Sequence, residues 1–190
     1  MAIFNAHQEV MIQQQPTQQD LPTQARWLGL AGLLPQSIFV LMAFYPAQKY
    51  IGLAAGYFYA SLIVSFLGGI YWGVVISRQN VPRWIFIAAV APSLLAFATG
   101  IPWMIGTSWP GPSLVILSIA LVCSLLVDRR LKHLGLISEA LFSLRVQLSV
   151  GLGAMTLVLA LLARRLVTAI LMCRSTNVSG LFPTNIRDRD

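Results

Sequence analysis

Charged residues are spaced so unevenly along this chain that four long segments contain none at all. These segments cover residues 27–48, 50–77, 84–127 and 146–163. A run of about 18 or more mostly apolar residues is long enough to cross the roughly 30 Å hydrocarbon core of a bilayer as a helix. The third run holds 44 residues, which is enough for two crossings. The sequence therefore predicts an all-α fold, an integral membrane bundle of about five transmembrane helices.

The remaining segments are short. Residues 1–26 are rich in glutamine and are expected to form a polar, disordered tail, residues 27–163 form the five-helix membrane domain, and residues 164–190 form a basic C-terminal tail. Only 10% of the chain is charged, against about 25% in an ordinary soluble domain. Neither tail is long enough to build a core of its own, so any activity is expected from the bundle or its rims.

The basic residues between the predicted spans indicate how the chain is oriented. The loops on the amino-terminal side hold six of them, and the opposite loops hold only Lys49. The six are Arg78, Arg83, Arg129, Arg130, Lys132 and Arg145. The positive-inside rule then places the N-terminus in the cytoplasm and the C-terminus outside, although Arg164 and Arg165 after the fifth span count against this. The first 26 residues resemble neither a cleaved signal peptide nor a transit peptide, which favours a bacterial inner membrane.

The net charge of +7 is not evidence for nucleic-acid binding. The basic residues neither cluster on one soluble face nor alternate with exposed aromatic residues, as a nucleic-acid groove requires. The expected partners are instead the lipid bilayer and either a membrane protein complex or a second copy of the chain.

The second predicted span carries small residues at a regular spacing. One row repeats every four residues, and a second row consists of Gly52, Gly56 and Ala60. The first row is Ser61, Ser65, Gly69, Gly73 and Ser77. Such rows let two helices approach closely in lipid, so they predict packing inside the bundle, a face for a partner or for self-association, or a narrow ligand cleft. The residues assigned to this packing or partner face are Ser61, Ser65, Gly68, Gly69, Trp72 and Gly73.

Proline interrupts two of the predicted spans. Pro35 lies in the first span and Pro92 in the third, and each removes one helical hydrogen bond and is expected to kink its helix. Gln36 and Ser37 are placed to satisfy the groups that Pro35 frees.

Ionisable side chains are expected only at the ends of the predicted spans. Asp128 follows the fourth span, Arg78 ends the second and Arg145 precedes the fifth, all on one side. Asp128 is expected to pair with Arg145 or Arg78, either to fasten helix ends or to form a site for lipid headgroups. No catalytic residue, cofactor or metal site is expected. An enzymatic activity would require Asp128, His133 and Glu139 to lie together in one active site.

These observations leave three functional hypotheses. The first is a non-enzymatic accessory or assembly subunit whose second span packs in the bundle or on a partner. The second is a carrier of a small solute or lipid, with a cleft between spans two, three and five. The third is a membrane enzyme.

The stretch 59–73 resembles the signature of an uncharacterised multi-pass membrane family that includes transmembrane protein 69. Its specific part is the sequence Ser-Phe-Leu-Gly-Gly-x-x-Trp-Gly at residues 65–73. Weaker matches lie at residues 28–35, 92–94, 128–130 and 144–145. The resemblance covers residues 26–163 and implies a five-span bundle of unknown biochemical function, found in proteobacteria and, in a mitochondrial form, in eukaryotes. It supplies no catalytic residue, and the basic tail after Ala163 departs from the family pattern.

Overall fold

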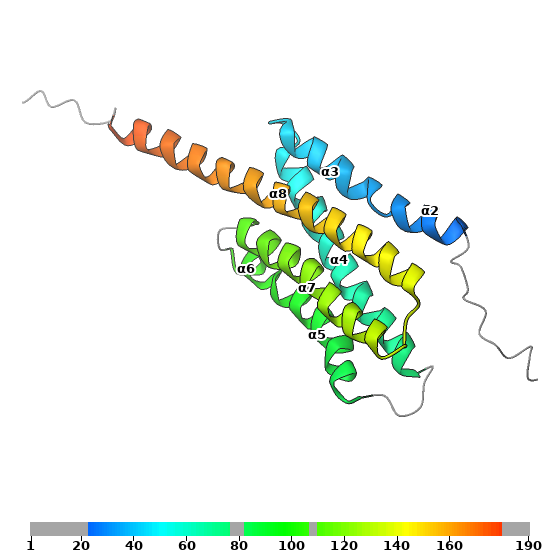
Figure 1. Cartoon of the computed structure of the whole chain (residues 1–190). Coiled ribbons are helices and arrows are strands. Elements are labelled where there is room, and N and C mark those ends of the chain that lie inside the picture. The colour runs from blue at the N-terminus through cyan, green and yellow to red at the C-terminus, as the bar shows by residue number, and fades with distance from the viewer. Residues whose placement is uncertain (1–22, 77–81, 107–109, 180–190) are drawn as a thin grey trace, which may run out of the picture.

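The computed structural model describes residues 23–76, 82–106 and 110–179, which form helices joined by short turns, with no strand among them (Figure 1). The helices are α2 (Thr23–Ala31), α3 (Leu34–Phe44), α4 (Lys49–Ile76), α5 (Trp84–Ala98), α6 (Ile101–Met104), α7 (Gly111–His133) and α8 (Glu139–Ser179). Within the described ranges, five stretches are long and apolar enough to cross a membrane, which confirms the predicted five-span bundle. They are Arg26–Phe44, Lys49–Ile76, Trp84–Met104, Gly111–His133 and Glu139–Arg164.

The first span is broken into α2 and α3 rather than kinked. Helix α2 ends at Ala31, and Pro35 stands in the first turn of α3, where a missing N–H costs nothing. The Ser37 hydroxyl donates to the Leu33 carbonyl at 2.9 Å, but this carbonyl already accepts the backbone N–H of Ser37, so it is not a group that Pro35 frees. The hydroxyl of Tyr59 on α4 donates to the Gly32 carbonyl and so holds the break against the bundle.

Gln36 has a different role from the one expected. Its side chain is fully buried, and its Nε2 donates to Thr156 Oγ1 on α8 at 3.1 Å. Gln36 therefore joins α3 to α8 across the interior instead of compensating for Pro35.

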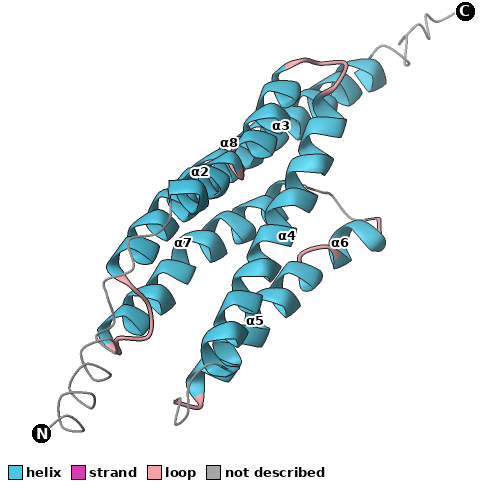
Figure 2. Ribbon diagram, turned by 90° about the vertical axis from the view of Figure 1, so that its right-hand side faces the viewer, coloured by secondary structure: helices cyan, strands magenta, loops and turns pink. Residues whose placement is uncertain are grey.

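Helix α4 lies at the centre of the bundle and packs against α3, α5, α7 and α8 (Figure 2). Three of its glycines make these contacts close. A Cβ at Gly52 would meet the backbone of α3 at 2.7 Å, a Cβ at Gly56 would clash with Leu159 of α8, and a Cβ at Gly68 would clash with the Ala89 carbonyl of α5. Small residues at these positions are what allow α4 to touch three neighbours.

Helices α7 and α8 form an antiparallel hairpin through a five-residue turn. The turn contains Gly135, whose φ of 66° lies in the left-handed region that favours glycine. The sequence placed Asp128 just after the fourth span. The structure differs, since α7 continues to His133 and Leu131 is fully buried.

Helix α8 has 41 residues and is therefore about 60 Å long, twice the thickness of the hydrocarbon core. Its C-terminal part extends beyond the other helices (Figure 1). The boundary drawn at residue 163 is thus not a break in the backbone, because the helix passes through it to Ser179.

Candidate functional site

A buried ion pair joins the last two helices. Asp128 lies on α7 and is 0% exposed, and Arg145 lies on α8 and is 5% exposed. Arg145 Nε is 3.0 Å from Asp128 Oδ2, although neither atom completes a well-directed hydrogen bond. Burying two charges is costly, and the cost is offset only where the charges compensate each other and their remaining polar atoms find partners.

Tyr71 of α4 completes this cluster. Its hydroxyl donates to Asp128 Oδ1 at 3.0 Å and also lies 3.2 Å from the Ser124 carbonyl. The guanidinium carbon of Arg145 is 5.1 Å from the centre of the Tyr71 ring, within range of a cation–π interaction. The three side chains therefore connect α4, α7 and α8 near the end of the bundle where α8 begins.

The structure thus brings Asp128 and Arg145 together, while Arg78 lies outside the described residues. The pair is enclosed by helices rather than placed at an open rim, because α7 continues for more than a turn beyond Asp128. Sequence reasoning missed Tyr71. The available signal was a phenol in an apolar run on the same helical face as Val64 and Leu67, since a buried tyrosine hydroxyl usually requires a partner.

The residues assigned to the packing or partner face of α4 divide between two directions. Ser65 and Gly68 face α5, where Ser65 Oγ is 3.0 Å from Ser93 Oγ. Trp72 also packs on α5, with its ring centre 5.9 Å from that of Phe86.

Ser61, Gly69 and Gly73 complete this set. Ser61 turns its hydroxyl back to the Phe58 carbonyl of its own helix. Gly69 and Gly73 face outward, and a Cβ added at either would meet no atom of the described chain within 4 Å. The residues that the sequence assigned to one face therefore belong to two. Ser65, Gly68 and Trp72 pack on α5, whereas Gly69 and Gly73 face outward.

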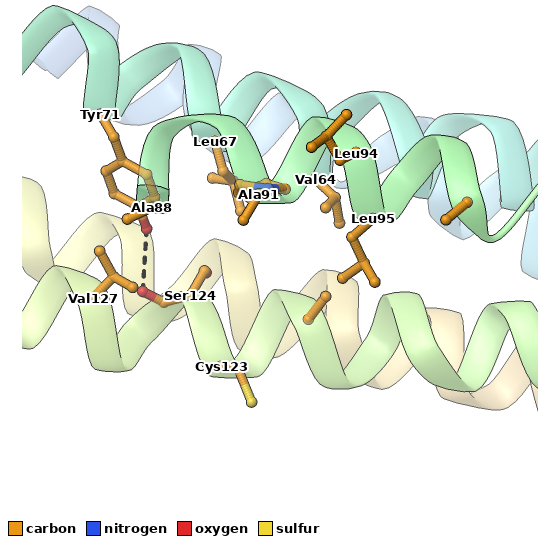
Figure 3. Close-up of a pocket in the computed structure, with 13 residues that line it drawn as sticks. Val64, Leu67, Tyr71, Ala88, Ala91, Leu94, Leu95, Cys123, Ser124 and Val127 are labelled. Carbon is orange, nitrogen blue, oxygen red and sulfur yellow. Dashed lines mark hydrogen bonds between the residues drawn. The ribbon is translucent and has the colours of Figure 1, made fainter. Parts of the chain in front are cut away.

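An apolar groove of about 570 Å³ lies between α4, α5 and α7 (Figure 3). Leu67 and Tyr71 of α4 and Leu95 of α5 lie opposite Ser124 and Val127 of α7. The groove therefore lies between spans two, three and four, whereas the sequence suggested a cleft that included span five. A smaller cavity between α2, α4 and α8 has a volume of about 240 Å³.

The three residues that an active site would require, Asp128, His133 and Glu139, do not lie together in one site. Asp128 is buried in its ion pair, whereas Glu139 is exposed and pairs with Lys132. His133 is exposed at the end of α7. Within the described ranges, no three His, Cys, Asp or Glu side chains lie close enough together to hold a metal ion.

Four apolar spans around a central fifth, with a buried ion pair between two of them, define a multi-pass α-helical membrane protein. Residues 21–162 match the family described as protein of unknown function (DUF3429). Because this match covers well over half of the 190 residues, the chain belongs to that family.

A curated relative agrees with this assignment. The chain is similar to Transmembrane protein 69 of Xenopus tropicalis, with 37% identity over 86 residues. The match takes in 41% of this chain and 32% of the relative, so the chain spans about a third of that protein's length. No solved structure matches the chain.

Proposed function

We propose that this protein is a non-enzymatic accessory or assembly subunit of a bacterial inner-membrane complex. The docking site in this proposal is the outer face of α4, which we define as Phe66, Gly69, Gly73 and Ile76. All four residues are exposed and lie on one side of the helix. The proposed occupant is a transmembrane helix of a partner protein.

The observation that carries this proposal is the contrast among the glycines of α4. A glycine inside a helix costs roughly 1 kcal/mol relative to alanine. Gly52, Gly56 and Gly68 offset that cost through close contacts with neighbouring helices, but Gly69 and Gly73 make no such contact within the described chain. A partner helix packed on this face would provide the missing contacts, because close approach in lipid requires small residues.

The charges of the bundle support a non-enzymatic role and an orientation. The buried charges of Asp128 and Arg145 compensate each other, and with Tyr71 they connect α4, α7 and α8. Arg129, Arg130 and Lys132 lie at the end of α7 from which the chain enters α8, which favours a cytoplasmic location for that end and for the N-terminus. The C-terminus is then outside.

Photo-crosslinking in intact membranes tests the proposed face. A photoreactive residue in place of Ile76 is expected to form an adduct with one membrane protein, and Gly73→Leu is expected to reduce the yield at least tenfold by blocking close approach. The same residue in place of Ile87, which is equally exposed on α5, should give no such adduct. Val90→Leu, which adds bulk elsewhere on the lipid-facing surface, should leave the adduct unchanged.

Two results would contradict the proposal. An Ile76 adduct that persists at full yield in Gly73→Leu would show that the glycines do not determine docking. An adduct with the mass of two copies of this chain would show that this face mediates self-association rather than the docking of a partner protein.

The groove between α4, α5 and α7 favours a second candidate, a carrier of a lipid or small apolar solute. Its volume of about 570 Å³ lies within the range of pockets that enclose small molecules, and its walls are almost wholly apolar. In reconstituted vesicles, Ala120→Trp is expected to fill the groove and to reduce the movement of fluorescent lipid to the protein-free rate. Ala154→Trp on the exposed side of α8 is the matched control. Equal transport by both variants would eliminate the carrier.

A further inference from the structure

The smaller cavity, between α2, α4 and α8, contains a single charged wall residue. Most of its wall is apolar and includes Leu28 of α2, Ile70 of α4, and Leu148 and Leu152 of α8. The charged wall residue is Arg145, the cation of the buried ion pair. A cavity of this kind has a polar end and an apolar end.

Arg145 uses only part of its guanidinium group within the protein. Nε faces Asp128, and one face of the group lies over the Tyr71 ring. The two terminal nitrogens, Nη1 and Nη2, are buried and have no hydrogen-bond partner among the described residues. A planar pair of N–H donors of this kind matches the oxygens of a phosphate or carboxylate in a bidentate arrangement.

The position of Arg145 along the bundle indicates where such an oxyanion would come from. Arg145 is six residues into α8, about 9 Å along its axis from Glu139. Arg129, Arg130 and Lys132 lie at the same end, near the C-terminal end of α7. The charged end of the cavity is therefore near a basic membrane surface, where cationic pockets between helices attract anionic headgroups.

The apolar end of the cavity points toward the middle of the bilayer. Leu148 and Leu152 follow Arg145 along α8 at intervals of three and four residues, so they lie on one face of the helix, progressively deeper in the bundle. A volume of about 240 Å³ is below that of pockets that enclose whole small molecules. The cavity thus suits part of a lipid, with the rest of the molecule in the membrane.

We propose that this cavity binds an anionic phospholipid, with the lipid phosphate accepting hydrogen bonds from Arg145 Nη1 and Nη2 and one acyl chain lying along Leu148 and Leu152. Asp128 and the Tyr71 ring hold the guanidinium in place. Because both terminal nitrogens are buried, the phosphate reaches them once neighbouring side chains of the cavity wall move aside. This site adjoins the proposed partner face, because Phe66 belongs to both, but the proposed contacts with Arg145, Leu148 and Leu152 do not require a partner helix.

Native mass spectrometry of the full chain in detergent tests the proposal with defined lipids. One phosphatidylglycerol is expected to bind at least tenfold more tightly than phosphatidylcholine with the same acyl chains. Arg145→Lys retains the charge opposite Asp128 but loses the paired donors, and it is expected to remove this preference. Arg130→Lys, at an exposed position on α7, is the matched control and should keep it.

A second variant and a competitor keep the test decisive even if Arg145→Lys fails to fold. Leu148→Trp fills the cavity while leaving Asp128 and Arg145 unsubstituted, and it is expected to weaken phosphatidylglycerol binding at least tenfold. Inorganic phosphate at millimolar concentration is expected not to displace the lipid. Equal binding of the two lipids by the unmodified protein, full binding by Leu148→Trp, or displacement by free phosphate would each overturn the proposal.

Discussion

Asp128→Asn is expected to lower the free energy of unfolding by about 3–5 kcal/mol, the usual effect of removing one partner of a buried ion pair. The asparagine retains the shape of the side chain and an acceptor for Tyr71, but it leaves the charge of Arg145 buried without compensation. Unfolding of the purified protein in mixed micelles, followed by circular dichroism as denaturing detergent is added, measures this change.

Two further variants isolate the charge as the cause. Glu139→Gln makes the same chemical change at a residue that is 84% exposed and pairs with Lys132, and it is expected to cost less than about 1 kcal/mol. The double variant Asp128→Leu with Arg145→Met removes both charges and is expected to be more stable than Asp128→Asn. An Asp128→Asn cost as small as that of Glu139→Gln would show that the pair contributes little.

The second large effect is expected from two adjacent glycines of α4 that differ in their surroundings. Gly68→Ala should destabilise the protein by about 1–3 kcal/mol, because its Cβ clashes with the Ala89 carbonyl and α5 must move away. Gly69→Ala should instead stabilise it by up to about 1 kcal/mol, because the new methyl group meets open space and alanine favours the helix. The same unfolding measurement compares them, and effects of equal sign would contradict the packing of α4 on α5.

The number and approximate positions of the spans follow from the sequence because a charge is costly in lipid and charge-free runs are easily recognised. The same reasoning placed the end of the fourth span at residue 127, one residue before Asp128. The structure extends α7 to His133, because the charge of Asp128 is compensated by Arg145 on the next helix. The pairing was expected as one of two alternatives, but its burial depends on three-dimensional packing that no local pattern encodes.

The small-residue row of α4 shows a second limit of sequence reasoning. Residues four apart in an α-helix differ by about 40° in direction, so a row from Ser61 to Gly73 turns by roughly 120° around the axis. One end of the row therefore faces a different direction from the other. This rotation explains why Ser65 contacts α5 while Gly69 and Gly73 face outward, although the sequence presents them as one series.

The ion pair between α7 and α8 also constrains how the chain enters the membrane during synthesis. A lone Asp or Arg in a helix inserted by the translocon costs about 2.5–3.5 kcal/mol at the bilayer centre and less toward its surface. Asp128 emerges from the ribosome before Arg145, so the fourth helix remains uncompensated until the first part of the fifth has been made. The five-residue turn holds the two helices close enough to pair at once. The last two spans are therefore expected to leave the translocon together, as one helical hairpin, and to dock on a Tyr71 that is already in the bilayer.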